Sequence, residues 1–199
     1  MPATDVRQLP EERKARVPDV MMVAADRGRV LGSDSAAVRM LIVSDYQCAE
    51  CRTLFDSVLP ALRTGYVDTG RARITWVHYP LKRHPGAVRA ASAALCASAQ
   101  GRFWDASAAL FAAQEAWGAA RAPDAMIDSL ASLPGIDAYA LRNCTASGRM
   151  LRQIRGDIDW TDTVRAGKPP TIVIGTRHLD GTLPLARLRA TLDSAIAGR

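Results

Sequence analysis

The sequence has no hydrophobic run close to the ~20 residues that a membrane-spanning helix needs, although 48% of its 199 residues are hydrophobic. Residues 1–19 are polar and charged, and they lack the apolar segment of a signal peptide. We therefore expect a chain without a membrane span. It is either cytoplasmic or exported by a leader that this sequence does not include.

The positive charge of the chain is not concentrated in one block. The formal net charge is +6, but the arginines are distributed along the whole sequence. A nucleic-acid-binding surface usually combines a basic stripe with aromatic residues, whereas dispersed arginines are typical of solvated helix faces. Nucleic acid is therefore not an expected partner. The chain also lacks repeats and low-complexity segments, and its length fits one domain or one domain with a large insertion.

Cysteine and histidine are scarce, with four and three residues respectively. Cys48 and Cys51 form a CxxC motif in "SDYQCAECRTLF", whereas Cys96 and Cys144 stand alone. A structural zinc site needs four ligands, usually supplied by a second CxxC or by closely spaced histidines. The remaining residues do not have that spacing, so we expect no metal ion. A redox dithiol and a pair of inert buried thiols stay open at this point.

Two predicted strands enclose the CxxC segment. Residues 36–45 form an apolar run with β-branched residues, which is typical of a buried strand, and residues 72–81 have the composition of a second strand. Between them, from Cys48 onward, apolar residues recur every fourth position, which predicts an amphipathic helix that Pro60 ends or kinks. A strand, a helix and a strand in this order predict a βαβ unit with a parallel pair of strands.

The remainder of the sequence predicts mostly helices. Residues 84–165 show helical periodicity with Pro and Gly at the breaks, and strand character returns at Pro170–Gly175. A turn into an edge strand and a closing amphipathic helix are predicted after it. We interpret residues 1–35 as an N-terminal extension with a short strand at 19–25. Residues 36–199 then form an α/β domain, with a helical insertion at about 84–165.

The position of the CxxC motif favours redox chemistry. The thiolate, and not the thiol, attacks a disulfide, and a helix N-terminus lowers the pKa of a cysteine from its usual ~8.5. Cys48 follows a predicted strand and begins a predicted helix, and Cys51 lies one turn further. A CxxC at the strand-to-helix junction of a βαβ unit is a much stronger signal than a CxxC alone.

Three segments in the right order carry a resemblance to a known family. The segments are "LIVSDYQCAECRTLF", "WVHYPLKRHPGAVRAASAALCASAQGRFWDASAALFAAQ" and "KPPTIVIGTRHLDGTLPLARLRATL". The chain resembles the DsbA-like branch of the thioredoxin superfamily over residues 36–199. These bacterial thiol–disulfide oxidoreductases have a thioredoxin fold, a central mixed sheet flanked by helices, with a large all-helical insertion. The resemblance implies redox activity on protein thiols and disulfides, no bound cofactor, and a cis-proline loop that faces the dithiol.

The resemblance assigns roles to individual residues. Cys48 is the attacking cysteine and Cys51 the resolving one. Pro170 is the cis-proline, and Pro169 stands where relatives usually carry Thr or Val. Because Pro169 has a carbonyl but no N–H, one backbone hydrogen bond to a substrate that relatives offer should be missing here.

Two acidic residues near the motif bear on its redox properties. Relatives more often carry Pro followed by an aromatic residue or His between the cysteines, where this chain has Ala49 and Glu50. A charged Glu50 would disfavour the Cys48 thiolate. Asp45 is interpreted as a strand-end or capping carboxylate, with a buried proton carrier as the alternative. His78 and His84 do not have a predicted catalytic role.

Cys96 and Cys144 lie on separate predicted helices of the insertion. In some relatives, cysteines at these places form a second disulfide, and the resemblance implies one here; two small core residues are the alternative. A disulfide would indicate an oxidising compartment. We therefore expect a periplasmic or extracytoplasmic location, with the cytoplasm as the alternative.

The sequence as a whole predicts a thiol–disulfide oxidoreductase. Its expected partners are proteins with thiols or disulfides and an unidentified redox partner, membrane-bound or not. The alternative is a non-catalytic module that senses redox state, or binds, while docked on a membrane protein.

Overall fold

The computed structural model describes residues 19–118, 124–181 and 183–198, and its centre is a mixed sheet with the strand order β1-β3-β2-β4-β5. β2 and β3 are parallel, whereas the β1–β3, β2–β4 and β4–β5 pairs are antiparallel. The predicted parallel pair is therefore confirmed. The strands are β1 Val30–Leu31, β2 Val38–Ser44, β3 Ala72–His78, β4 Thr171–Ile174 and β5 Arg177–Asp180.

Other residues pack on both faces of the central strands. Because side chains on both faces are buried, the sequences of β2 and β4 are nearly continuous apolar runs. Ile42 and Trp76 face the main core, whereas Val43, Val77 and Val173 pack on the other face with Ala166. β3 ends at His78, earlier than the predicted strand, which ran to residue 81 and included Pro80.

A long helical run leads away from β2, as the sequence predicts. It comprises α2 Ala49–Thr53, η2 Leu54–Val58, α3 Leu59–Leu62 and η3 Arg63–Val67, of which η2 and η3 are π-helical. Pro60 lies in the first turn of α3, directly after η2. Because proline has no N–H to donate one turn back, the α-helical hydrogen-bond pattern is interrupted near this residue, yet the run continues to Val67.

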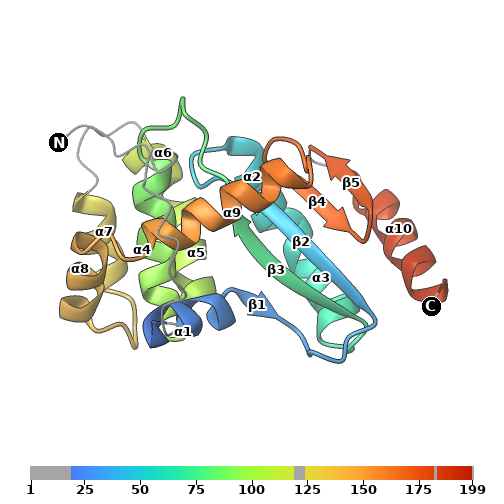
Figure 1. Ribbon diagram of the computed structural model, residues 1–199, viewed down its shortest axis with the longest axis horizontal. Coiled ribbons are helices and arrows are strands. Elements are labelled where there is room, and N and C mark those ends of the chain that lie inside the picture. The colour runs from blue at the N-terminus through green and yellow to red at the C-terminus, as the bar shows by residue number, and fades with distance from the viewer. Residues whose placement is uncertain (1–18, 119–123, 182, 199) are drawn as a thin grey trace.

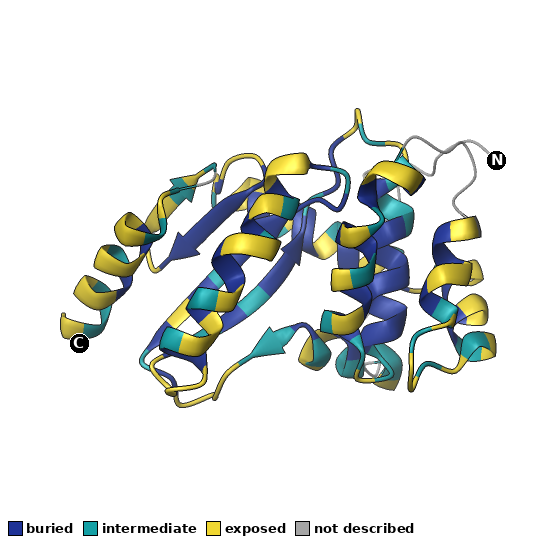
Figure 2. Cartoon of the chain, turned by 180° about the vertical axis from the view of Figure 1, so that it is seen from behind, coloured by how far each residue is buried: buried dark blue, intermediate teal, exposed yellow. Residues whose placement is uncertain are grey.

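Most of the helices between β3 and β4 form a body beside the sheet, and the last of them, α9, runs from that body across one face of the sheet (Figure 1). α4 is almost wholly buried at its centre, and half of its 12 residues are alanine, which lets the neighbouring helices approach closely. Figure 2 shows the buried residues concentrated in the central strands β2, β3 and β4 and in the helices next to them, whereas the edge strands are intermediate or exposed. The helices of this body are α4 Ala87–Ser98, α5 Phe103–Ala112, α6 Gln114–Gly118, α7 Asp124–Ala131 and α8 Ala138–Ala146, and the helix across the sheet is α9 Leu151–Thr163. The chain then forms β4, β5 and α10 Leu185–Ala197.

Aromatic side chains join the helical body to the sheet. The ring centroid of Phe55 lies 5.0 Å from that of Phe111 and 5.7 Å from that of Trp76. Trp104 lies within 6.0 Å of Trp76, edge to face. Aromatic pairs at these separations stabilise by about 0.5–1.5 kcal/mol beyond their buried area. The three phenylalanines of the chain, two of its four tryptophans and Tyr46 gather at this junction.

The strand predicted at residues 19–25 is wrong, because this segment is helical. α1 spans Val20–Gly28, and the carboxylate of Asp19 caps it by accepting a hydrogen bond from the backbone N–H of Met21. The methionines and alanines of the segment are good helix formers, and Ala25 packs into the core. A short strand does lie in the predicted extension, but it is β1, which pairs with β3. Residues 1–18 of that extension lie outside the described residues.

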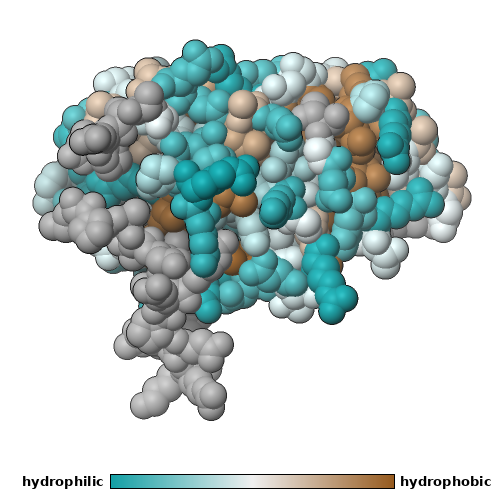
Figure 3. Space-filling model, turned by 90° about the horizontal axis from the view of Figure 1, so that it is seen from above, coloured by the Kyte–Doolittle hydropathy of each residue, from teal (hydrophilic) through white to brown (hydrophobic). Residues whose placement is uncertain are grey.

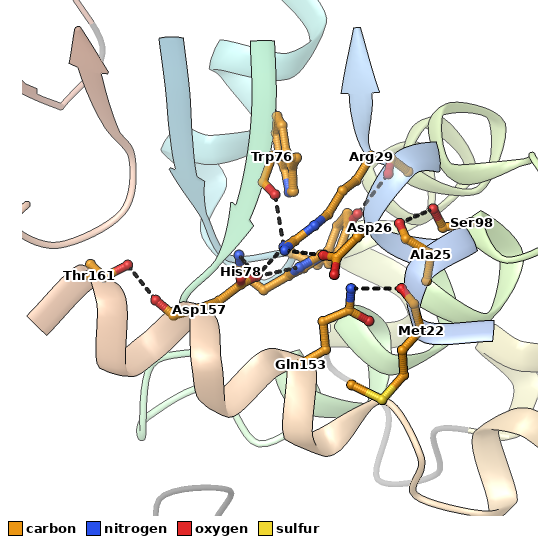
Figure 4. Close-up of polar contacts among 12 residues, drawn as sticks. Met22, Ala25, Asp26, Arg29, Trp76, His78, Ser98, Gln153, Asp157 and Thr161 are labelled. Atoms are coloured by element: carbon orange, nitrogen blue, oxygen red, sulfur yellow. Dashed lines mark hydrogen bonds and ion pairs between the residues drawn. The ribbon is translucent and has the colours of Figure 1, made fainter. Parts of the chain in front are cut away.

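A buried polar cluster fastens α1 and α9 to the end of β3 (Figure 4). The guanidinium of Arg29 pairs with Asp157 of α9 and donates to the carbonyl of Trp76 (3.1 Å). Asp157 also accepts from the backbone N–H of His78 (2.8 Å). Burial lowers the pKa of His78, so its ring is neutral at pH 7. A buried ion pair with further hydrogen bonds fixes a geometry more than it adds stability, and here it joins three elements.

Candidate active site

Cys48 lies at the junction of β2 and α2, where it is the N-cap residue of the helix. Its extended backbone (φ −81°, ψ 119°) turns the chain into α2, and its carbonyl accepts the first helical hydrogen bond, from Arg52 N (3.2 Å). The Cys48 side chain is 8% exposed, whereas Cys51 is fully buried. Both are free cysteines. One sulfur is thus reachable from solvent and the other lies behind it.

The two thiols have opposite electrostatic environments. A hydrogen bond from the Cys51 thiol is the largest cause that lowers the pKa of Cys48 to about 6, and the backbone N–H groups of Cys51 and Glu50 add to it, while burial and the Asp45 charge oppose it. Burial, followed by the Cys48 thiolate, raises the pKa of Cys51 far above its usual range. The N–H groups at the helix N-terminus therefore stabilise the thiolate of Cys48 only. At neutral pH the pair consists of a Cys48 thiolate and a Cys51 thiol.

We expect the alkylation rate of Cys48 in the reduced protein to rise with pH through about 6 and then level off, because the thiolate fraction is complete above its pKa. An unperturbed cysteine, with a pKa of about 8.5, would keep gaining reactivity to pH 9. Pulsed alkylation followed by peptide mass spectrometry measures both cysteines in one sample. Faster labelling of Cys51 than of Cys48 would contradict this assignment.

The loop before β4 faces the dithiol. The Pro169–Pro170 peptide bond is cis. The carbonyl oxygen of Pro169 lies 3.9 Å from the Cys48 sulfur, and that of Pro170 accepts from Gly181 N (2.8 Å) instead. The loop thus presents one backbone acceptor beside the sulfur, and Pro169 adds no donor. Figure 3 views the end of the molecule that carries α2 and this loop; hydrophilic side chains cover much of it, with hydrophobic patches between them.

Asp45 is a fully buried strand-end carboxylate. One of its oxygens accepts from Gln47 N (2.7 Å), and the other accepts from Leu81 N (2.8 Å) and lies 2.8 Å from His84 Nδ1. These contacts fasten the loop after β3 to the segment that carries Cys48. The backbone N–H of Asp45 also points at the Cys51 sulfur (3.5 Å). A role of Asp45 as a proton carrier stays a prediction.

Glu50 is exposed in the first turn of α2. We expect Glu50→Gln to lower the pKa of Cys48 and to raise the redox potential slightly, because the carboxylate opposes a nearby thiolate. At an assumed ~7 Å in water the effect is about 0.6 kcal/mol, or roughly 13 mV for two electrons. Thiolate absorbance and equilibration with glutathione measure the two quantities. Asp68→Asn, an exposed charge removed beyond the end of η3, is the control. An unchanged or higher pKa in Glu50→Gln would show that its charge does not reach the sulfur.

Cys96 of α4 and Cys144 of α8 are joined by a disulfide, with their Cα atoms 5.8 Å apart. The bond lies within the helical body and links two helices that are separated by α5, α6 and α7 in the chain. It is a separate feature from the Cys48–Cys51 dithiol.

Sequence reasoning missed the polar residues that support the dithiol from other elements. His84 has no predicted role at the site, yet it lies against Asp45. Gln114, in the helical body, donates to the carbonyl of Cys48. No local signal could have indicated Gln114, because its position follows from the packing of α6 onto the active-site segment.

Within residues 19–118, 124–181 and 183–198, no group of three or more His, Cys, Asp and Glu residues is arranged to hold a metal ion. None of the helices in this part of the chain has the length and apolar character to cross a membrane.

Comparison with known proteins identifies the family. A family model described as thioredoxin matches residues 24–194. The chain is 23% identical over 156 residues to the "Probable disulfide bond formation protein D" of Bacillus anthracis, covering 77% of this chain and 72% of that protein. It is 31% identical over 201 residues to the "Na(+)/H(+) antiporter NhaA 1" of Salinispora arenicola, covering 96% of this chain and 29% of that protein. The chain thus spans less than a third of the length of the antiporters that it matches.

Solved structures share the fold. BdbD from Bacillus subtilis superimposes with a TM-score of 0.77 at 22% identity, covering 86% of this chain and 94% of that one. The α-DsbA1 of Wolbachia pipientis superimposes with a TM-score of 0.75 at 18% identity, covering 85% of this chain and 91% of that one. Both the thioredoxin sheet and the helical insertion are included in matches of this extent. The chain belongs to the thioredoxin family and has the fold of its DsbA-like branch.

Proposed function

We propose that this protein is a thiol–disulfide oxidoreductase that acts on protein thiols and disulfides through Cys48 and Cys51. The observation that carries the proposal is the asymmetry of the pair. Cys48 lies at a helix N-terminus, is 8% exposed and has its pKa lowered to about 6, whereas Cys51 is fully buried and its pKa is raised. An attacking thiolate and a resolving thiol need these two environments.

The exchange proceeds through a mixed disulfide. In the oxidising direction, a substrate thiolate attacks the Cys48 sulfur of the Cys48–Cys51 disulfide, and Cys51 leaves as a thiolate and takes up a proton. A second substrate thiolate then attacks the substrate sulfur bound to Cys48, so that the substrate gains a disulfide and Cys48 leaves as a thiolate. Two electrons pass from the substrate to the dithiol. In the reducing direction the steps reverse, with the Cys48 thiolate as the nucleophile.

The low pKa of Cys48 makes it a good leaving group and stabilises the reduced dithiol, which favours oxidation of the substrate. The carbonyl of Pro169 beside the sulfur offers an acceptor to a backbone N–H of the bound substrate chain. Because Pro169 has no N–H, it can accept a backbone hydrogen bond from the substrate but cannot donate one. A separate redox partner must regenerate the dithiol after each cycle.

An extracytoplasmic location fits this proposal. The Cys96–Cys144 disulfide would persist in an oxidising compartment and would be reduced in most cytosols. Similarity to a protein described as disulfide bond formation protein D supports the same chemistry.

The alternative, a redox-sensing module without turnover, predicts a dithiol that titrates but does not catalyse. Matches to sequences described as sodium–proton antiporters say nothing about sensing by the dithiol. Two turnover assays separate the possibilities: oxidation of a reduced, unfolded protein substrate in glutathione buffer, and reduction of insulin by dithiothreitol. We expect a catalysed rate in at least one. Stoichiometric reaction without catalysis in both would overturn the proposal and leave the sensor.

A further inference from the structure

Gln114, the first residue of α6, makes two hydrogen bonds to the backbone of the active-site segment. Its side-chain Nε2 donates to the carbonyl of Cys48 (3.0 Å) and to the carbonyl of Tyr46 (2.6 Å). The side chain is buried, with the residue 6% exposed. One amide of the helical body therefore holds both carbonyls that flank Gln47, and one of them belongs to the attacking cysteine itself.

The orientation of the Cys48 carbonyl affects where the Cys48 sulfur lies relative to α2. The carbonyl belongs to the N-cap residue of α2 and also accepts from Arg52 N (3.2 Å). The direction of this peptide group fixes how the cap residue enters the helix. Whether the sulfur receives the N–H groups of the first turn depends on that entry, because those groups point along the helix axis. A second donor on the same carbonyl restricts the rotation of the peptide group.

Neighbouring contacts tie the same two segments together. Gln47 donates to the carbonyl of Gly118 (3.3 Å), at the other end of α6, and it also accepts from the N–H of Gly86 (2.5 Å), the N-cap of α4. On the exposed side, Arg52 pairs with Glu115 (3.0 Å). Residues at both ends of α6 therefore contact the segment around the start of α2. Gln114 makes the buried contact between α6 and the Cys48 backbone.

We propose that Gln114 is a positioning residue for the dithiol, and that its amide holds the Cys48 backbone so that the sulfur stays at the N-terminus of α2. The helical insertion thereby sets the reactivity of the cysteine as well as packing beside the sheet. This inference rests on the proposed function, which makes Cys48 the reacting cysteine.

The test replaces Gln114 by Met, which has a similar length and no amide donor. We expect the pKa of Cys48, now about 6, to rise by up to about one unit, the equivalent of losing a hydrogen bond of ordinary strength. The equilibrium constant with glutathione should shift by up to about tenfold toward the disulfide form, or about 30 mV for a two-electron couple. Thiolate absorbance and glutathione equilibration measure these two quantities, and thermal unfolding is recorded alongside them.

Gln100→Met is the matched control. Gln100 also belongs to the helical body, where it follows α4, and both ends of its amide bond to the backbone of Asp137, the N-cap of α8. We expect this variant to change stability only. Gln114→Asn, which keeps an amide too short to reach the Cys48 carbonyl, should follow Gln114→Met in direction.

The outcomes are distinct. A higher Cys48 pKa in the folded Gln114 variants, with Gln100→Met unchanged, supports the proposal. A lower melting temperature with an unchanged pKa and potential would make Gln114 a residue of stability alone and overturn it, as would failure of both variants to fold. Because thiolate titration needs no substrate, absence of turnover in the unmodified protein would reject the proposed function and still leave the Gln114 result readable.

Discussion

Cys48→Ser should abolish turnover, and Cys51→Ser should trap substrates as mixed disulfides. Serine cannot form a disulfide, so loss of Cys48 removes the only sulfur of the pair that a substrate can reach. Loss of Cys51 leaves the lowered-pKa thiolate of Cys48 to react once, without a buried thiol to resolve the product. We expect the rate of Cys48→Ser to fall to the uncatalysed background.

The mixed disulfides are measured as substrate-linked bands that appear without reductant and disappear with it. The double variant Cys48→Ser/Cys51→Ser is the control, and it should form none. Trapping by Cys48→Ser in place of Cys51→Ser would reverse the roles of the two cysteines. Turnover that persists in both single variants would mean that the dithiol does not carry the activity.

Removal of the Cys96–Cys144 disulfide should have the largest effect on stability. The bond closes a loop with a sequence separation of 48 residues, and the chain-entropy model gives about 4 kcal/mol for a loop of that length. For a domain of this size that amounts to a loss of roughly 8–16 °C in melting temperature. The double variant Cys96→Ala/Cys144→Ala avoids a free thiol, and thermal unfolding without reductant measures the change.

Two controls isolate the disulfide. With both proteins reduced, the difference should shrink to the packing contribution of two buried sulfurs, and the pKa of Cys48 should be the same in both. Peptide mass spectrometry of protein made in an oxidising compartment should show Cys96 linked to Cys144. Free thiols at both positions, or no stability difference in the oxidised proteins, would contradict the prediction.

The fold was predictable from the sequence where the pattern is local. The apolar run before Cys48, the helical periodicity after it and the strand predicted at residues 72–81 are each patterns of neighbouring residues, so they indicate β2, α2 and β3 directly, although β3 ends at His78. The segment 19–25 shows the limit of such patterns. Its apolar residues fit a strand or a helix, and the Asp19 cap and packing against α4 decide for the helix.

What the sequence by itself determined was the chemistry: two cysteines one turn apart, placed where a strand passes into a helix. This depends only on neighbouring residues, because a helix N-terminus is a property of the chain at that point. The tertiary structure decided which groups surround the sulfurs. Pro169 lies beside Cys48 although 121 positions separate them, and Gln114 reaches the same residue across 66. Such contacts arise from the packing of whole helices and loops, and local periodicity does not encode them.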